Sequence, residues 1–558
     1  MNNIDTIQKH KHKSKINKDL ECKCGILAYK SINVPIKIYE FIKRLEKLQN
    51  RGRDSCGITY LDNNNNYITF KESGTIQDIF FNINHNEITK EKINNLLNTE
   101  TKFIIGHLRY ATSGNNKNIK DNQDNQDLFN VDNMNNNNYM QPFTNITNKL
   151  SIIHNGNIPD KELNKIINKI NLKYPNFRNN NTNNNTNNID NTDNTDFFDK
   201  INNNNNIHDS KVFFDYLDYH QYIKDKISFD NYIKNTLTLF NGSFNFIVMK
   251  DNDLYIIRDK YGYKPLCYGI NEDNSILISS ESVSFELINN EYETYKTYKY
   301  IDNIKTNSVL KLIEPKTSIH KYEFNQLNGS LFSIDKHSYC VFEYIYFMNG
   351  LSKINNTITV DDYREKLGIE LAKQEKLNFI SYFKRNINDI IVIGSPNTGI
   401  CGGKSYASYL NLPYKQVLIK KPNCGRTFIL PDNNIRDKFF KKFVLNTEDI
   451  KNKIIIFLDD SIVRGNTIKN MCDLFKENGA KELHIRILSP ELKYPCYYGI
   501  NIPTHEELVM NNYTIEQFEK KCNLNSLRYL NIKSLTKLFG NSMCSACFDG
   551  NYNQNIDF

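Results

Sequence analysis

The chain has 558 residues, a hydrophobic fraction of 39% and a formal net charge of +8. A chain of this length is too long for a single hydrophobic core, so at least two domains are predicted. No stretch approaches the ~20 apolar residues of a membrane span, the N-terminus lacks an apolar secretion segment, and no basic stripe interleaved with aromatics indicates nucleic acid. We therefore expect a cytoplasmic protein that acts on small polyanions, with no membrane or nucleic-acid partner, whose twelve cysteines are free thiols, a nucleophile or metal ligands.

Two asparagine-rich tracts, near residues 115–140 and 178–206, dilute the hydrophobic average. They carry few side chains that could bury surface, so we expect mobile surface insertions there. The segments around them have ordinary globular patterns.

The N-terminal half begins with a predicted strand that follows Cys24 and Gly25. A helix is predicted next, because Ile38, Phe41, Ile42, Leu45 and Leu48 recur at helical spacing. The run LQNRG (48–52) ends that helix before a strand that starts near Gly57. The runs GHLRYAT (106–112) and IHNGN (153–157) each follow a strand-like segment and end in polar groups that could face a ligand.

These runs, in this order, resemble the glutaminase domain of the N-terminal-nucleophile glutamine amidotransferases. That family has a cysteine–glycine start, then LQHRG, GHxRYAT and HNGN; this chain departs from it at Asn50, where the family has histidine. The resemblance implies an α+β fold, an αββα sandwich, over residues 24–325. The stretches 258–266 and 279–282 also resemble family segments, with Lys264 in place of an arginine, and we expect them to be structural.

The resemblance implies a role for each site residue. The side-chain amide of Asn155 and the backbone N–H of Gly156 would form the oxyanion hole. Arg109 would pair with the carboxylate of glutamine, and Asp209 would hold its amino group. For Asp209, plain helix N-capping is the alternative.

Glutamine hydrolysis needs a nucleophile and a base. A cysteine at a mature N-terminus supplies both, because its α-amino group has a pKa of about 8 and can accept the thiol proton. We therefore predict cleavage before Cys24, with loss of a leader that comprises residues 1–23. Cys22 is the competing candidate, and Cys24 is preferred because it directly precedes Gly25.

In the C-terminal half, strands and helices alternate, with strands predicted at 390–394, 453–458 and 483–487 and a helix C-cap at Gly479. This alternation predicts an α/β domain with a doubly wound parallel sheet. Ligands bind such sheets at the carboxyl ends of the strands, where the loops 395–399 and 459–467 fall.

The 459–467 loop joins a buried strand to a helix, and its amides and hydroxyls suit a phosphate group. Asp459 and Asp460 would repel a phosphate but suit the vicinal hydroxyls of a ribose. The loop resembles the phosphoribosyl-pyrophosphate (PRPP) loop of type I phosphoribosyltransferases. The alternative is a generic loop at a sheet switch point, with a chance pair of acids.

From Cys24 to Gly550, apart from the asparagine tracts, the chain resembles the amidophosphoribosyltransferase family of purine synthesis. The resemblance implies a phosphoribosyltransferase domain at 326–535 and a C-terminal segment at 536–558. Ammonia from glutamine would attack C1 of PRPP and release pyrophosphate. Asp459 and Asp460 would hold the ribose hydroxyls near Mg²⁺, and Lys420 and Thr398 would face the pyrophosphate. The 5′-phosphate would be held by Ser461, Ile462, Val463, Arg464, Gly465, Asn466 and Thr467.

The resemblance also implies inhibition by purine nucleotides and a homo-oligomer, a dimer or tetramer. One branch of the family binds a [4Fe–4S] cluster at positions that here hold Cys340, Cys496, Cys544 and Cys547. Zinc and an empty set of reduced thiols are the alternatives.

Two segments depart from the family pattern. FARPDS is replaced by FMNGLS at 347–352, and KNRYVGRTF is replaced by KKPNCGRTF at 420–428. The resemblance places the first where the domains communicate and the second in a closing loop, so we expect these changes to affect the coupling between the sites more than either site alone. A PRPP- or nucleotide-binding regulatory protein that has lost or uncoupled its transferase activity is therefore the alternative function. Asparagine synthetase and glucosamine-6-phosphate synthase share the glutaminase half, but the 459–467 loop argues against both.

Overall fold

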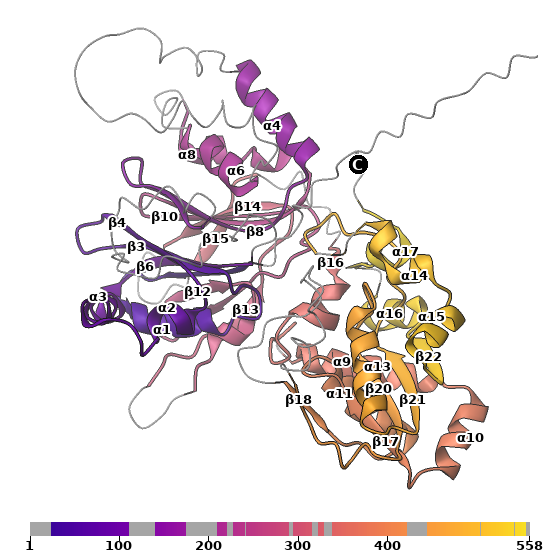
Figure 1. Ribbon diagram of the computed structural model, residues 1–558. Coiled ribbons are helices and arrows are strands. Elements are labelled where there is room, and N and C mark those ends of the chain that lie inside the picture. The colour runs from indigo at the N-terminus through magenta and orange to yellow at the C-terminus, as the bar shows by residue number, and fades with distance from the viewer. Residues whose placement is uncertain are drawn as a thin grey trace, which may run out of the picture.

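The computed structural model describes residues 24–110, 140–173, 209–219, 227–239, 241–288, 294–314, 322–328, 337–355, 357–420, 443–500, 502, 504–540 and 542–553. The predicted leader, residues 115–139 and 178–206 of the asparagine tracts, and the segment 421–428 lie outside these ranges. Figure 1 shows the described residues as two bodies that lie side by side, with the N-terminal half in one and the C-terminal half in the other.

Two stacked antiparallel sheets form the first body (Figure 1). One has seven strands in the order β13 (Lys299–Asn303), β11 (Cys267–Ile270), β12 (Ile276–Ser279), β1 (Gly25–Lys30), β6 (Phe103–Arg109), β3 (Ser55–Leu61) and β4 (Tyr67–Ser73). The other has six, in the order β15 (Glu323–Gln326), β14 (Ser308–Ile313), β10 (Asp253–Arg258), β9 (Ser243–Lys250), β8 (Leu150–Asn157) and β7 (Phe143–Asn145). A short pair, β2 (Ile36–Lys37) and β5 (Glu100–Thr101), lies beside them.

Strand β1 is buried on both faces, which explains its continuous apolar run. Side chains alternate across a strand. Ile26 and Ala28 accordingly belong to the core between the two sheets, and Leu27 and Tyr29 pack in the core under the outer helices. The nucleophile candidate therefore precedes a rigid central strand.

Helices cover the outer face of each sheet (Figure 1). The seven-stranded sheet carries α1 (Ile38–Glu46), α2 (Ile76–Phe80) and α3 (Glu87–Asn98), and the six-stranded sheet carries α4 (Asp160–Lys173), α6 (Asp209–Asp218) and α8 (Phe229–Ile233). The predicted αββα sandwich is confirmed. The predicted helix at Ile38 ends at Glu46, and Leu48 is buried just beyond it.

The second body is built on a four-stranded parallel sheet in the order β17 (Ile390–Gly394), β20 (Ile454–Asp459), β21 (Glu482–Ile487) and β22 (Ser526–Tyr529). The helices around it are α9 (Val360–Lys373), α10 (Leu377–Arg385), α11 (Gly399–Leu410), α13 (Asn466–Glu477), α15 (Ile515–Cys522) and α16 (Ile532–Phe539). The predicted parallel α/β domain is confirmed, and Gly479 follows α13 with φ +83°. A small antiparallel pair, β18 (Leu418–Lys420) and β19 (Phe443–Leu445), lies apart from this sheet.

The C-terminal segment returns to the start of the second body. Strand β16 (Tyr339–Cys340) pairs in parallel with β23 (Met543–Cys544), and the short helices α14 (Val509–Asn512) and α17 (Ala546–Asp549) lie on that side (Figure 1). A π-helical turn, η7 (Glu343–Phe347), follows β16. The boundaries at 325/326 and 535/536 stay predictions.

Among the described residues, no helix combines the length and the hydropathy that a membrane crossing needs.

Candidate active sites

Cys24 lies directly before β1, with 2% of its surface exposed. Gly25 pairs with Leu108 of β6, so Cys24 lies near the end of β6 where Arg109 stands. The backbone carbonyl of Cys24 accepts a hydrogen bond from Arg51 Nε at 3.1 Å. The predicted nucleophile is thus held by a strand on one side and by a buried guanidinium on the other.

Asn155 and Gly156 lie just before the last residue of β8, in the opposite sheet, and β1 contacts β8 across the core. The Asn155 side chain is fully buried, and neither its oxygen nor its nitrogen has a hydrogen-bond partner in the described part of the chain. Buried amides are normally paired, so this one is available for a ligand. Only glycine fits at position 156, because a Cβ there would lie 2.0 Å from the carbonyl oxygen of Ser243.

Arg109 and Asp209 flank the same region from two elements. Arg109 is the last residue of β6 and is half-buried. Asp209 is the first residue of α6, where its carboxylate accepts from the backbone N–H groups of Ile158 at 3.2 Å and Ser210 at 2.6 Å. Asp209 therefore ties the start of α6 to the residue after β8, and its predicted contact with glutamine stays a prediction.

The two predicted phosphate-site loops lie together in the second body. Strands β17 and β20 are neighbours, so the loops that follow them leave the same edge of the sheet. Thr398 Oγ1 donates to Asp460 Oδ2, which joins the 395–399 loop to the acidic pair. Ser461 Oγ donates to Asp460 Oδ1 at 2.6 Å. The adjacency of the two loops, predicted from the alternating pattern, is confirmed.

The turn into α13 depends on Gly465, which has φ +80° and immediately precedes the helix. Ile462 is buried in the core beneath the loop, and the Val463 carbonyl accepts from the backbone of Val509. Arg464 pairs with Glu507 at 2.8 Å near the surface. Asn466 and Thr467 begin the helix, so the loop presents a helix N-terminus to whatever it binds.

Asp459 and Asp460 are both buried, with 7% and 5% of their surfaces exposed. Burial raises the pKa of Asp459 well above its usual range, and the charge of Asp460 raises it further. Two adjacent buried carboxylates resist simultaneous ionisation, so this pair favours a ligand that brings hydroxyl donors or a cation.

The region of the predicted closing loop is only partly described. Lys420 ends β18, where its backbone pairs with Phe443, but its side chain and residues 421–428 lie outside the described residues. Its predicted contact with pyrophosphate therefore stays a prediction.

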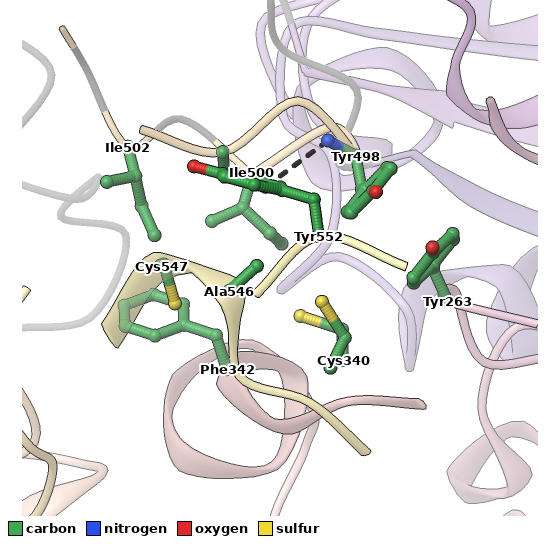
Figure 2. Close-up of a pocket in the computed structure, with 11 residues that line it drawn as sticks. Tyr263, Cys340, Phe342, Tyr498, Ile500, Ile502, Ala546, Cys547 and Tyr552 are labelled. Atoms are coloured by element: carbon green, nitrogen blue, oxygen red, sulfur yellow. Dashed lines mark hydrogen bonds between the residues drawn. The ribbon is translucent and has the colours of Figure 1, made fainter. Parts of the chain in front are cut away.

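The four predicted cluster cysteines line one apolar cavity (Figure 2). Cys340 and Cys544 are register partners in the β16–β23 pair, Cys547 lies on α17 and Cys496 lies in the loop after β21. Tyr263 comes to this cavity from the glutaminase half and stacks on Tyr498 with ring centroids 4.0 Å apart.

The four thiols line the same cavity but are not close enough together to coordinate one metal ion. Among the described residues, no three or more His, Cys, Asp or Glu side chains are close enough to hold a metal ion. The cavity has a volume of about 10 Å³, room for about one water molecule. Burial raises the pKa of Cys340 to about 12, so these thiols stay protonated unless a metal replaces the proton.

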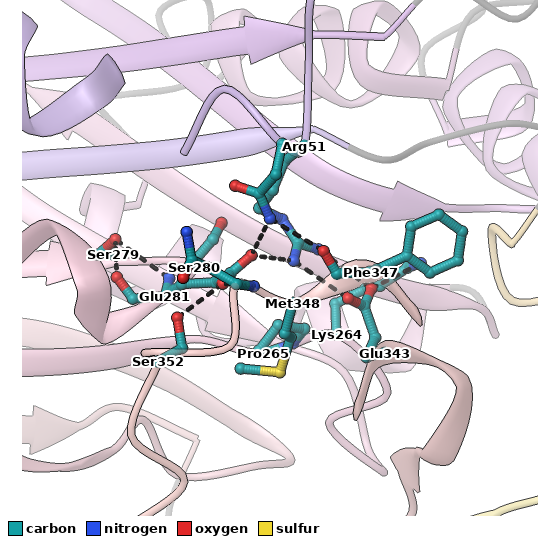
Figure 3. Close-up of polar contacts among 12 residues, drawn as sticks. Arg51, Lys264, Pro265, Ser279, Ser280, Glu281, Glu343, Phe347, Met348 and Ser352 are labelled. Atoms are coloured by element: carbon teal, nitrogen blue, oxygen red, sulfur yellow. Dashed lines mark hydrogen bonds and ion pairs between the residues drawn. The ribbon is translucent and has the colours of Figure 1, made fainter. Parts of the chain in front are cut away.

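A buried charge network, which the sequence patterns did not reveal, joins the two bodies (Figure 3). Arg51 binds Glu281 Oε1 at 2.8 Å and Glu343 at 3.0 and 3.1 Å. Lys264 binds Glu343 at 3.3 Å and the carbonyl of Gly499 at 2.9 Å. The four charged side chains are two cations and two anions, each at most 2% exposed, so their formal charges cancel inside the protein.

The network is electrostatically matched. Burial by itself would raise the pKa of Glu343, but the charges of Arg51 and Lys264 outweigh burial and lower that pKa to about 2. The sequence could have singled out Arg51, because it stands in the LQNRG run, but nothing in the sequence pairs it with Glu281 or Glu343.

Comparisons with known proteins agree with both halves. The family description "Glutamine amidotransferase domain" matches residues 185–286, and "Phosphoribosyl transferase domain" matches residues 362–491. An amidophosphoribosyltransferase from Methanocaldococcus jannaschii is 29% identical, over 96% of this chain and 98% of that protein. The amidophosphoribosyltransferase from Homo sapiens is 33% identical, over 54% of this chain and 57% of that protein.

A solved structure of glutamine PRPP amidotransferase from B. subtilis, complexed with ADP and GMP, has the same fold as this chain. The TM-score is 0.67 with 24% identity, over 95% of this chain and 97% of that chain. With both domains in this order and relatives that match along nearly the whole chain, this protein is a member of the amidophosphoribosyltransferase family, a glutamine-dependent phosphoribosyltransferase.

Proposed function

We propose that this chain carries out its family's reaction with Cys24 as the nucleophile and the 459–467 loop as the phosphoribosyl site. The reaction hydrolyses glutamine and joins the ammonia to C1 of PRPP, giving 5-phosphoribosylamine, glutamate and pyrophosphate, the first committed step of purine synthesis. The observation that carries the assignment is the presence of two sites in one chain: the unpartnered Asn155 amide on β8, the strand that β1 contacts across the core, and the buried acid pair at the start of the 459–467 loop.

In the glutaminase half, the thiolate of Cys24 attacks the carboxamide carbon of glutamine, and ammonia leaves as a thioester forms. Water then cleaves the thioester to release glutamate. Asn155 Nδ2 and the N–H of Gly156 stabilise the oxyanion in both steps. Arg109 binds the carboxylate of glutamine and Asp209 its amino group. The α-amino group of Cys24 serves as the base, which requires cleavage before Cys24.

In the transferase half, Asp459 and Asp460 accept hydrogen bonds from the 2′- and 3′-hydroxyls of the ribose. The segment Ser461 to Thr467 holds the 5′-phosphate at the N-terminus of α13. Thr398 and Lys420 face the pyrophosphate. Mg²⁺, when bound near the acid pair, would neutralise charge on the departing pyrophosphate. Ammonia then attacks C1 as the bond to pyrophosphate breaks.

The donor set at the cysteine cavity fits an iron–sulfur cluster in chemistry, because four thiols from four elements face one apolar space. The residues that would hold a [4Fe–4S] cluster are Cys340, Cys496, Cys544 and Cys547. Since the cavity is smaller than a cluster, loading requires the thiols to move outward. The cluster would cross-link the C-terminal segment to β16 and act as a structural element.

We expect that Cys547→Ala removes most iron and inorganic sulfide from protein purified without oxygen, because one of four ligands is lost. Iron, sulfide, zinc and visible absorbance are measured on the same samples. Cys472→Ala is the matched control, since Cys472 is a fully buried thiol in a different core. Stoichiometric zinc in the wild-type protein, or no metal at all, would contradict the cluster.

Purine nucleotides, in this proposal, bind to the enzyme and inhibit it. Support comes from the B. subtilis amidotransferase, which was solved in complex with ADP and GMP. A homo-oligomer and a cytoplasmic location complete the proposal.

The function is tested by pyrophosphate release from PRPP, once with glutamine and once with ammonia, on protein purified without oxygen. Release with both donors is the expected result. Release with ammonia alone would place a defect in the maturation of Cys24 or in ammonia transfer. No release with either donor would favour the regulatory protein, the alternative that the changed segments 348–352 and 421–424 suggest.

A further inference from the structure

One carboxylate, that of Glu281, collects hydrogen bonds from both bodies of the molecule (Figure 3). From the glutaminase side, Asn50 Nδ2 and Arg51 Nη1 donate to Oε1 at 3.0 and 2.8 Å. From the other side, the backbone N–H of Asn349 and the hydroxyl of Ser352 donate to Oε2, both at 2.7 Å. The four donors fill the capacity of an ionised carboxylate, and Glu281 and Ser352 are fully buried.

Two of the donors on Glu281 lie at positions where this chain departs from its family pattern. Asn50 stands where the family has histidine, and Asn349, which donates through its backbone, lies among the changed residues 348–351, whereas Ser352 matches the last serine of FARPDS. The Asn50 amide also donates to the Phe347 carbonyl at 2.9 Å. Asn50 and the 347–352 segment therefore meet at one site, where they bond to each other and to the same carboxylate.

On the glutaminase side, the path from Glu281 to the nucleophile is short. Arg51 contacts Glu281 through one nitrogen and the carbonyl of Cys24 through another. A displacement of Glu281 therefore changes the position of the guanidinium that holds the backbone of Cys24.

On the transferase side, the 347–352 segment is bonded to α9. Gly350 and Ser352 carbonyls accept from the first backbone N–H groups of α9, and Arg364 of α9 donates to the Met348 carbonyl at 2.8 Å. Helices α9 and α11 pack so closely that their backbones meet at two glycines. A Cβ on Gly368 would lie 2.1 Å from the carbonyl oxygen of Gly402. Helix α11 begins at Gly399, the last residue of the predicted pyrophosphate loop.

We propose that Glu281 is a positioning residue that couples the two sites: the 347–352 segment, carried by α9 and α11, sets the Cys24 backbone through Glu281 and Arg51. This role rests on the proposed function, and it includes contacts from Asn50 and Asn349, two positions where this chain departs from the family pattern. Occupation of the 395–399 loop by PRPP shifts α11 and α9, and Glu281 transmits the shift to Cys24.

The test uses Asn50→Ala, Ser352→Ala and the double variant, because each single change removes one donor and leaves Arg51 paired with Glu281. Three quantities are measured: glutamine hydrolysis without PRPP, glutamine hydrolysis with saturating PRPP, and pyrophosphate release from PRPP with ammonia. Lys353→Ala is the matched control, since it breaks an exposed contact with Glu286 from the residue that directly follows the segment.

Each single variant is expected to lower the stimulation of glutamine hydrolysis by PRPP about tenfold, the scale of one hydrogen bond to a charged group. Ammonia-dependent release stays within about twofold of wild type, and the control behaves as wild type. The double variant loses less than the product of the two single losses, because both donors act through one carboxylate.

Two results would overturn the coupling role: unchanged stimulation in both single variants, or a parallel fall of all three quantities, as general loosening of the structure would give. Absence of ammonia-dependent release in the wild-type protein would instead overturn the proposed function itself, so the two failures are distinguishable.

Discussion

Cys24→Ala is expected to abolish glutamine-dependent pyrophosphate release, by at least about 10⁴-fold, and to leave ammonia-dependent release intact. The alanine removes the nucleophile. In the structure, Cys24 directly precedes β1, across the core from β8, the strand that carries the unpartnered Asn155 amide. The measurement is pyrophosphate formed per enzyme with each nitrogen donor, together with the mass of the mature N-terminus, which is expected to begin at Cys24.

Cys56→Ala is the matched control, because Cys56 is a buried thiol in the same sandwich, in the core beneath the helices. It should keep activity with both donors. Glutamine-dependent activity that survives in Cys24→Ala would refute Cys24 as the nucleophile and favour Cys22. An active protein that retains residues 1–23 would refute an N-terminal nucleophile altogether.

Asp459→Asn and Asp460→Asn are each expected to lower kcat/KM for PRPP by about tenfold to a hundredfold, with glutamine and with ammonia alike. A hydrogen bond from a hydroxyl to a carboxylate contributes about 1.5–3 kcal/mol, and tenfold corresponds to about 1.4 kcal/mol. Asp473→Asn is the control, since Asp473 forms a partly exposed pair with Lys469 on α13, away from the loop.

Asp459→Asn should not lose stability. Burial and the charge of Asp460 raise the pKa of Asp459 well above its usual range, so the folded state disfavours the negative charge that the neutral amide removes. We expect the Tm of Asp459→Asn to equal or exceed that of wild type, as is common for residues kept for function. A lower Tm with parallel loss of all activities would show that the acid pair is structural.

The fold and the phosphate loop were predictable because their signals are local. Residues 454–458 form one apolar run that two acids follow, and Gly465 precedes an amphipathic helix, so periodicity and loop chemistry suffice. The strand predicted near Gly57 begins at Ser55, because Ser55 already pairs with Arg109 and Ser73. Pairing between strands sets that boundary, and a single sequence does not show it.

The interdomain network was not predictable, because its partners are far apart along the chain. Arg51 is 230 residues from Glu281 and 292 residues from Glu343. Nothing in the sequence pairs these three residues with one another, and only the packing of the two bodies buries them together. The contacts of the 347–352 segment were not predictable for the same reason. Its changed sequence suggests weakened coupling, whereas in the structure Asn349 and Ser352 both donate to Glu281 across the domain boundary.

The most direct test of two coupled sites in one chain is the ratio of pyrophosphate to glutamate formed from glutamine and saturating PRPP by the wild-type protein. The account predicts a ratio near one, with little glutamate formed when PRPP is left out. Glutamate formation that is independent of PRPP, with pyrophosphate far below it, would contradict the coupling of Cys24 to the 459–467 loop.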